Sequence, residues 1–341
     1  MIPLTELGKQ VEEFAGLCLP DFTYTSKDLR GLRFEKIDLS EFTGDDKEDP
    51  YCGLKLEVDE VDKPHVFTRW SRGQLLSHLG CREKWFESVA IDQEVDELNK
   101  RLHVLRPYML RTMKSYYSED LLVVRGLVSR HFADIPDTAI MKALTDVLPE
   151  GYAVAHQSGK TDRAFYAYAV TEKEISIPNT DFVALPGVVI KNSEVGYTSL
   201  WVVPMMFIPE HGVCIVLRKH ASLRKVHRGD ASDLAAKFSA ALESAKVLWG
   251  SLAEKIDKLK SLSFLTEEDA LVAMSTMLKA AGSEQGFITA CTAAYKEAAH
   301  TSHSAMGILN AIMVCVKKEC DKDDAYVSSE LAGAVLLQIL K

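Results

Sequence analysis

The residues best suited to chemistry are basic side chains gathered between Val216 and Arg228, in the sequence VLRKHASLRKVHR. This segment holds five lysines and arginines, two histidines and no acidic residue. Cations concentrated in this way attract anions, and a row of them can follow a sugar–phosphate backbone. A structural role, or pairing with the acidic N-terminal segment, is the alternative. The residues expected to contact nucleic acid are Lys191, Arg218, Lys219, His220, Arg224, Lys225, His227 and Arg228.

Aromatic residues near the basic segment offer a second kind of contact. Aromatic rings stack on the exposed bases of a single strand, which a duplex hides. Alternation along a strand over residues 164–171 places two tyrosines on one face, where they could also pack beneath a helix. The expected stacking platforms are Tyr166, Tyr168, Tyr197 and Trp201.

The sequence NSEVG at residues 192–196 predicts a turn that leads into the next strand. Asn192 and Ser193 favour turns through hydrogen bonds from side chain to backbone, and Gly196 permits a positive φ. We expect Glu194 to be held by a cation from the strand predicted over residues 121–132. A buried ion pair of this kind would fix the hairpin in place rather than perform chemistry. The candidate cations are Arg125 and Arg130.

Catalytic motifs are lacking in the sequence. It contains no GxxxxGK[ST] loop for a nucleotide, no GxGxxG after a strand and no GxSxG esterase motif. His300 and His303 are three apart and could face one way on a helix, but no further metal ligand can be placed beside them. We therefore expect no catalytic residue, no metal and no cofactor. An enzyme built around histidines is the least favoured class.

The elements that must position these residues predict an α+β fold. Between residues 65 and 230 the apolar spacing predicts helices first, and then a mixed or antiparallel sheet with helices on one face. The segment IPEHG predicts a hairpin between Met205 and Ile215. Residues 231–341 contain no proline and predict an α-helical region, in which Thr266 and Asp269 form a capping arrangement. The expected elements are helices over 71–78, 92–105, 137–148 and 232–259, and strands over 51–58, 121–132, 152–157, 164–171 and 183–190.

Charge divides the chain of 341 residues into three expected parts. Residues 1–64 form an acidic arm with a net charge of −8, residues 65–230 form the α+β core, and residues 231–341 form the helical region. Only the middle of the chain has a positive balance, +3 over residues 65–229. The total of −9 argues against strong non-specific binding to duplex DNA, but a local basic groove remains compatible with it.

Composition favours a soluble cytoplasmic protein. Apolar residues make up 47% of the chain and charged residues 26%, as in ordinary globular proteins. The longest apolar runs, such as residues 200–208, are too short to cross a membrane, and the first residues do not resemble a secretory signal. Seven scattered cysteines without a CxxC pair are typical of reduced thiols.

Part of the sequence resembles a known family. The run VVRGLVSRHFADIPDTAIMKAL, followed by GVVIKNSEVGYTSLWVVPMMF and VLRKHASLRKVHRG, is similar to the phage- and plasmid-like family of unknown function numbered 932. The resemblance covers about residues 65–230, and its most specific part is NSEVG with Ser199, Leu200 and Pro204. The segment FIPEHGVCIVL departs from the family's pattern. The resemblance implies a mobile genetic element in a bacterial cytoplasm, and no particular activity.

The order of the expected elements is also similar to that of phage single-strand annealing proteins of the eukaryotic-annealase type. Those proteins form rings or filaments and hold single-stranded DNA in a basic groove without hydrolysing nucleotides. We therefore expect a homo-oligomeric protein of phage or plasmid DNA metabolism that binds single-stranded DNA or RNA, in annealing, recombination or protection. The alternative is a protein–protein interaction module, as in an anti-host or virion-associated factor, without nucleic-acid binding.

Overall fold

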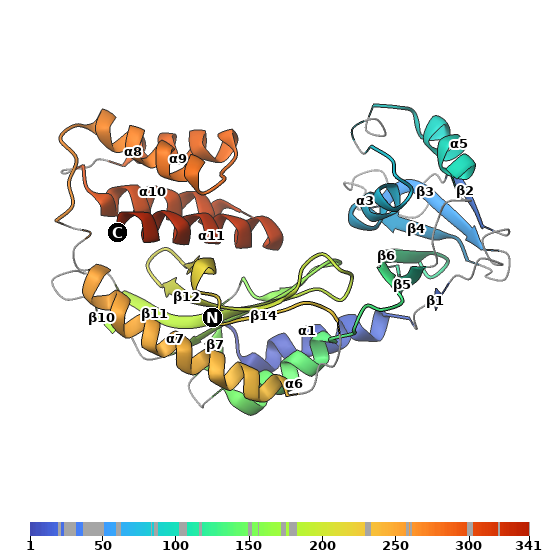
Figure 1. Ribbon diagram of the computed structural model, residues 1–341, viewed down its shortest axis with the longest axis horizontal. Coiled ribbons are helices and arrows are strands. Elements are labelled where there is room, and N and C mark those ends of the chain that lie inside the picture. Colours follow the sequence, from blue (N-terminus) through green and yellow to red (C-terminus); the bar gives the residue numbers. More distant parts are fainter. Residues whose placement is uncertain are drawn as a thin grey trace.

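The computed structural model contains two β-sheets with helices packed against both of them (Figure 1). The expected α+β class and the α-helical C-terminal region are both confirmed. The strands divide into two sheets, whereas the sequence predicted one. The structure describes residues 1–19, 22–23, 32–36, 51–58, 63–82, 84, 88–101, 108–115, 118–148, 152–155, 157–171, 175–176, 183–228, 233–256, 259, 261–298, 303–319 and 321–340.

The first sheet has six strands in the order β1-β5-β6-β4-β3-β2. Its strands are β1 (Phe22–Thr23), β2 (Leu32–Lys36), β3 (Tyr51–Val58), β4 (His65–Thr68), β5 (Tyr108–Lys114) and β6 (Leu122–Ser129). The β4–β6 pair is parallel and the other pairs are antiparallel, so the sheet is mixed. Leucines of α3 (Arg69–His78) and α5 (Ile91–Arg101) pack on it in one apolar core.

The second sheet is entirely antiparallel among its described strands. Its strands are β7 (Tyr152–Val154), β8 (Gly159–Lys160), β9 (Phe165–Thr171), β10 (Ile175–Ser176), β11 (Val183–Asn192), β12 (Leu200–Ile208), β13 (Val213–Val216) and β14 (Leu223–Lys225). The central order is β13-β12-β11-β9-β7, and β14 pairs with the start of β12. The β12–β13 hairpin turns at residues 209–212, as the sequence predicted.

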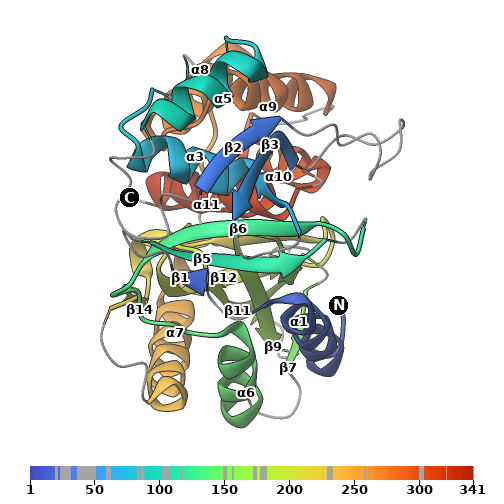
Figure 2. The same ribbon diagram turned by 90° about the vertical axis from the view of Figure 1, so that its right-hand side faces the viewer.

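Helices cover both faces of the second sheet (Figure 1). On one face lie α1 (Leu4–Leu17), α6 (Asp137–Val147) and α7 (Leu234–Ile256). On the other lie α10 (Ala305–Lys318) and α11 (Lys322–Ile339), with α8 (Glu267–Ala280) and α9 (Gln285–Glu297) beyond them. Figure 2 shows the first sheet in front of this sandwich, with β5 and β6 near the height of the second sheet and β2 and β3 in front of the C-terminal helices.

The alternation predicted along β9 is confirmed by the two cores. Phe165, Ala167 and Ala169 belong to the core that includes α6 and α7, whereas Tyr166 and Tyr168 belong to the core that includes α11. Successive side chains of a strand point to opposite faces, and both faces of this sheet are covered. The strand is therefore buried along almost its whole length.

Local signals set the ends of several helices. Thr68 caps α3 by accepting a hydrogen bond from the Ser71 amide, so the helix begins two residues before the expected residue 71, and Gly80 ends that region with a φ of 68°. The capping box of Thr266 and Asp269 forms at the start of α8, as the sequence predicted. None of the helices in the described ranges is both long enough and apolar enough to cross a membrane.

The described parts of residues 1–64 join both halves of the fold. Helix α1 packs beside α6, and Ile2 forms a bridge with Val154 of β7. The predicted strand over residues 51–58 is present as β3, and it pairs with β4 across the boundary expected at residue 65. The most acidic segment, residues 43–50, lies outside the described residues.

Candidate functional site

The turn at residues 192–196 joins β11 to β12 and docks against the first sheet. Ser193 Oγ accepts hydrogen bonds from the Val195 and Tyr197 amides at 3.2 and 2.9 Å. Gly196 has a φ of 77°, which confirms the predicted turn geometry. A Cβ added at Gly126 of β6 would lie only 2.6 Å from the Cβ of Val195, so the two sheets approach closely here.

Side chains of α3 hold the same turn from the other side. Trp70 Nε1 and Gln74 Nε2 donate hydrogen bonds to the Val195 carbonyl at 3.3 and 2.9 Å. Arg111 Nη1 of β5 donates to the Glu194 carbonyl at 2.7 Å. These bonds cross from the first sheet to the second, so the turn fixes the position of one sheet against the other.

Glu194 is the centre of a buried ionic network. Its Oε2 accepts hydrogen bonds from Arg125 Nη2 at 3.1 Å and from Lys160 Nζ at 3.0 Å, while Oε1 accepts one from the Asp137 amide at 3.0 Å. Burial opposes ionisation of this carboxyl, but Lys160 and Arg125 outweigh that effect and lower its pKa to about 2. Of the two arginines predicted to hold Glu194, Arg125 does so. Arg130 is exposed beyond the end of β6.

A cleft with a volume of about 440 Å³ opens beside this turn, between the end of β6 and the strands β12 and β14. We call it the arginine cleft, because three arginines line it. Among its described lining residues there is no carboxylate. The lining comprises Ser129, His131, Phe132, Gly196, Tyr197, Thr198, Ser199, Trp201, Arg218, Arg224, Val226, His227 and Arg228.

The arginines of the cleft differ in how far other groups neutralise them. Arg218 and Arg224 place their guanidinium carbons 5.1 and 4.8 Å from the centre of the Trp201 ring. Arg218 also pairs with Glu330 of α11, with 2.9 Å between Nη1 and Oε2. Arg224 and Arg228 are exposed, and neither forms an ion pair with another described residue. Their charges are therefore the ones open to an anionic ligand.

His227 forms part of the cleft wall and is almost fully buried. Its ring stacks on Phe132, with 4.5 Å between ring centres and an angle of 7°. Its Nδ1 lies 3.1 Å from the carbonyl oxygen of Ala133. Burial lowers the pKa of this histidine below its usual 6.5, so the neutral ring is favoured at neutral pH.

The arginine cleft brings together half of the residues predicted to bind nucleic acid. Lys219 and His220 are exposed on the short 3-10 helix η3 (Arg218–His220), outside the lining of the cleft. Lys225 follows Arg224 along β14 and so points to the other face of the strand. The predicted residues that do line the cleft are Tyr197, Trp201, Arg218, Arg224, His227 and Arg228.

Three of the predicted residues are corrected by their burial under α11. Tyr166 and Tyr168 are 0% and 1% exposed, so neither ring can stack on a base. Lys191 is also buried, with its Nζ 4.1 Å from the ring centre of Tyr326 and 5.2 Å from that of Tyr197. Burial lowers the pKa of Lys191 to about 8. The tyrosines pack beneath a helix, which was the alternative that the sequence left open.

Sequence patterns missed the wall of the cleft that the first sheet provides. Ser129, His131 and Phe132 follow directly from β6, which ends at Ser129 and not at Phe132 as predicted. A polar and aromatic run just after a strand was a weak signal for a site. The other residues that line the cleft begin at Gly196, about seventy residues further along the chain. No local sequence pattern predicts that these two segments meet.

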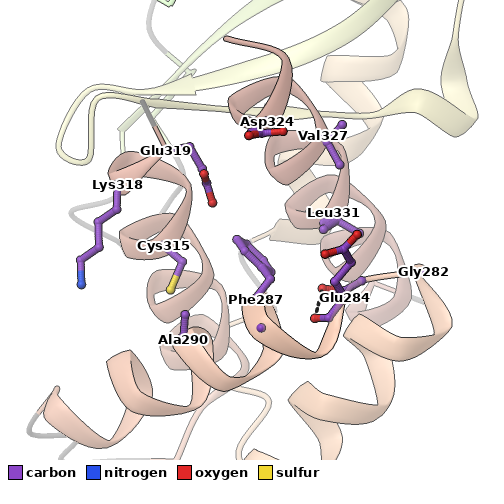
Figure 3. Close-up of a pocket in the computed structure, with 12 residues that line it drawn as sticks. Gly282, Glu284, Phe287, Ala290, Cys315, Lys318, Glu319, Asp324, Val327 and Leu331 are labelled. Atoms are coloured by element: carbon purple, nitrogen blue, oxygen red, sulfur yellow. Dashed lines mark hydrogen bonds between the residues drawn. The ribbon is translucent and has the colours of Figure 1, made fainter. Parts of the chain in front are cut away.

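A second cavity, of about 520 Å³, lies among the C-terminal helices (Figure 3). Phe287 occupies its middle, and the carboxylates of Glu319 and Asp324 point toward its upper part, while the Lys318 ammonium points away. Burial and the nearby Asp324 raise the pKa of Glu319. None of the predicted site residues lines this cavity.

Among the residues that the structure describes, no three histidine, cysteine, aspartate or glutamate side chains come together in an arrangement that could hold a metal ion. Of the histidine pair singled out in the sequence, His303 is described and His300 lies outside the described residues.

Comparison with known proteins gives no relative: the chain matches no protein-family model, no curated protein and no solved structure. The resemblance to the phage- and plasmid-like family therefore stays a prediction. Function has to be argued from the arginine cleft itself.

Proposed function

We propose that this protein binds single-stranded nucleic acid in the arginine cleft. The observation that carries the proposal is the grouping of Arg218, Arg224 and Arg228 around one cleft without a lining carboxylate, in a chain whose net charge is −9. Like charges repel one another, and a protein with an excess of acidic residues has many carboxylates that could neutralise neighbouring cations. A cleft that keeps three cations together, of which only Arg218 pairs with a described acid, is therefore suited to an anionic ligand.

The chemistry of the lining favours a phosphate-bearing chain as that ligand. Guanidinium groups bind phosphate oxygens through paired hydrogen bonds, and the cleft adds the hydroxyl groups of Ser129, Thr198 and Ser199. Arginine planes and aromatic rings also stack on bases, and Arg224 already lies over the Trp201 ring. One lining can thus hold both the backbone and a base.

The size of the cleft supports a single strand over a duplex. Its volume of about 440 Å³ falls at the lower end of the usual range for small-ligand sites, ~300–1,000 Å³. Such a space takes a nucleotide-sized part of a chain. A duplex would present only its backbone to the cleft, because its bases are stacked inside.

We extend the proposal to annealing of complementary strands by an assembly of copies of this chain. Annealing needs phosphates held by the protein while the bases stay free to pair, and it needs no nucleotide hydrolysis. The lack of a nucleotide-binding loop in the sequence is compatible with it. Measuring how fast two labelled complementary strands pair, with and without the protein, tests this part separately from binding.

The test of binding is fluorescence anisotropy with labelled single-stranded and duplex oligonucleotides across a salt series. We expect the single strand to bind more tightly. Replacing Arg224 and Arg228 together by alanine should weaken binding at least tenfold at low salt, and should reduce the slope of log K against log[salt] by about 1.4, roughly 0.7 for each lost phosphate contact.

A matched control removes the same charge elsewhere. Lys279 and Lys296 are exposed on α8 and α9, away from the arginine cleft, and their double alanine variant should bind like the unchanged protein. Equal loss of affinity in both variants would show that only net charge matters. Absence of any binding by the unchanged protein at low salt would refute the proposal and turn the search toward partner proteins.

A further inference from the structure

His227, which lines the arginine cleft, has one ring nitrogen with a hydrogen-bond partner and one without. The ring has two nitrogens, and Nδ1 lies 3.1 Å from the Ala133 carbonyl oxygen. A carbonyl oxygen can only accept, so Nδ1 must carry the hydrogen. In the neutral ring that burial favours, Nε2 is then left with a bare lone pair.

Nothing in the described part of the chain bonds to this lone pair. His227 is 7% exposed, and its Nε2 has no hydrogen-bond partner there. It is also the only side chain among the described residues lining the cleft whose buried polar atom lacks a partner. A buried polar atom without a partner destabilises a folded protein, and one that lies at a cleft can gain its partner from a ligand.

The surrounding groups limit what that partner can be. An acceptor needs a donor, such as a hydroxyl group, whereas the arginines beside it need anionic oxygens. The phosphodiester of a DNA backbone satisfies the arginines alone, because it carries no hydroxyl group. A ribonucleotide satisfies both, because its 2′-hydroxyl can donate and is joined through the sugar to the phosphate. Deoxyribose presents only a C–H group at that position.

We propose that His227 Nε2 accepts a hydrogen bond from a ribose 2′-hydroxyl, so that the arginine cleft binds single-stranded RNA in preference to single-stranded DNA. This inference rests on the proposed function and names the substrate class of the same site. Nε2 is closed to solvent in the free protein, so a neighbouring side chain must move when the ligand enters. Arg228, the next residue, is exposed and forms no ion pair with a described residue, so it can make that movement.

The test compares three labelled single strands of one base sequence: RNA, DNA and 2′-O-methyl RNA. The methyl group removes the donor hydrogen but leaves a ribose-type sugar. We expect the unchanged protein to bind RNA about five- to tenfold more tightly than the other two, which should bind alike, as befits one hydrogen bond to a neutral acceptor.

Two variants assign the preference to His227. In His227→Asn the side-chain amide can still donate to the Ala133 carbonyl, but the acceptor at the Nε2 position is lost. In His227→Phe the stacking on Phe132 is kept without either nitrogen. Each variant should bind RNA only as tightly as it binds DNA, so the ratio of the two affinities should fall to about one.

The outcomes separate this inference from the proposed function. Equal binding of RNA, 2′-O-methyl RNA and DNA by the unchanged protein would overturn the role of His227 and leave single-strand binding intact. A preference for RNA that persists in a folded variant would also overturn it. Failure of all three strands to bind would overturn the proposed function itself. If neither variant folds, the comparison of RNA with 2′-O-methyl RNA still decides the matter.

Discussion

At the scale of single residues, the largely buried carboxylate of Glu194 connects several parts of the fold through its hydrogen bonds. It accepts hydrogen bonds from Arg125 and Lys160 and from a backbone amide of α6. Arg125 forms its ion pair with Glu194, whereas Lys160 also pairs with Asp137. A buried charge that loses its partner is more costly than the pair is favourable. Glu194 therefore contributes to stability mainly because its removal would leave a buried cation without an ionised partner.

Replacing Glu194 by glutamine should lower the free energy of unfolding by about 3 kcal/mol, because it leaves the buried Arg125 with an uncharged partner, whereas Lys160 keeps its ion pair with Asp137. Urea unfolding followed by circular dichroism measures the change. The matched control is Glu243→Gln, which breaks a pair with Lys246 that is more than half exposed and should change stability by under about 1 kcal/mol. Similar stability of both variants would argue against a structural role for the network.

Residue types alone predicted this part of the site well. The turn-forming side chain of Ser193 and the positive φ at Gly196 follow from local chemistry, so the sequence shows them directly. The turn role predicted for Asn192 is wrong, because its side chain donates to the Ile135 carbonyl and to Asp137 instead. The Glu194–Arg125 pair was predictable because a buried acid needs a cation, and few cations lie in apolar strands. The sequence did not reveal the second cation, Lys160, since it lies in the two-residue strand β8, which is too short to show an apolar pattern.

At the scale of elements, the placement of α11 over the second sheet explains the predictions that failed. Tyr166, Tyr168 and Lys191 lie on a face that α11 covers, so they could not serve as contacts for a ligand. The covering helix is more than a hundred residues further along the chain, and its contact face includes small residues such as Ala332 and Gly333. Small residues give little periodic signal, so the sequence did not show which face α11 would cover.

The approach of α11 to β13 makes a prediction at Gly333. A Cβ at that position would lie 1.9 Å from the carbonyl oxygen of Val216, a backbone atom that cannot move aside without disturbing the pairing of β13 with β12. Gly333→Ala should therefore push α11 away and lower the free energy of unfolding by about 1–3 kcal/mol, the usual cost of overpacking. The movement should also raise the exposure of Tyr166 and Tyr168, which tyrosine fluorescence quenching would detect.

A glycine in another helix provides the control for that experiment. A Cβ at Gly250 of α7 would meet no atom within 4 Å, so Gly250→Ala should stabilise the protein by about 0.5–1 kcal/mol through helix propensity alone. If Gly333→Ala were equally stabilising, the close packing of α11 on β13 would be wrong.

At the scale of the whole molecule, the cleft depends on the joining of two sheets. One wall follows β6 of the first sheet, and the other comes from β12, β14 and the turn before β12. The order of the second sheet was largely predictable from its meander of consecutive strands, but the division into two sheets was not. That division needs β4 to pair in parallel with β6, which is a contact between distant segments.

This arrangement predicts how a bound strand should protect the backbone. A ligand in the arginine cleft must touch both walls, so hydrogen–deuterium exchange should slow together at residues 130–133, 196–199 and 223–228. Helices α8 and α9, on the far side of α10 and α11, should exchange as in the free protein and serve as the internal control (Figure 1). Protection confined to the basic segment after β13 would mean that the ligand lies on the surface of the second sheet alone, and the first sheet would then have no part in binding. Protection of both walls at once would show that the ligand occupies the space between the sheets, which the Glu194 network holds at a fixed separation.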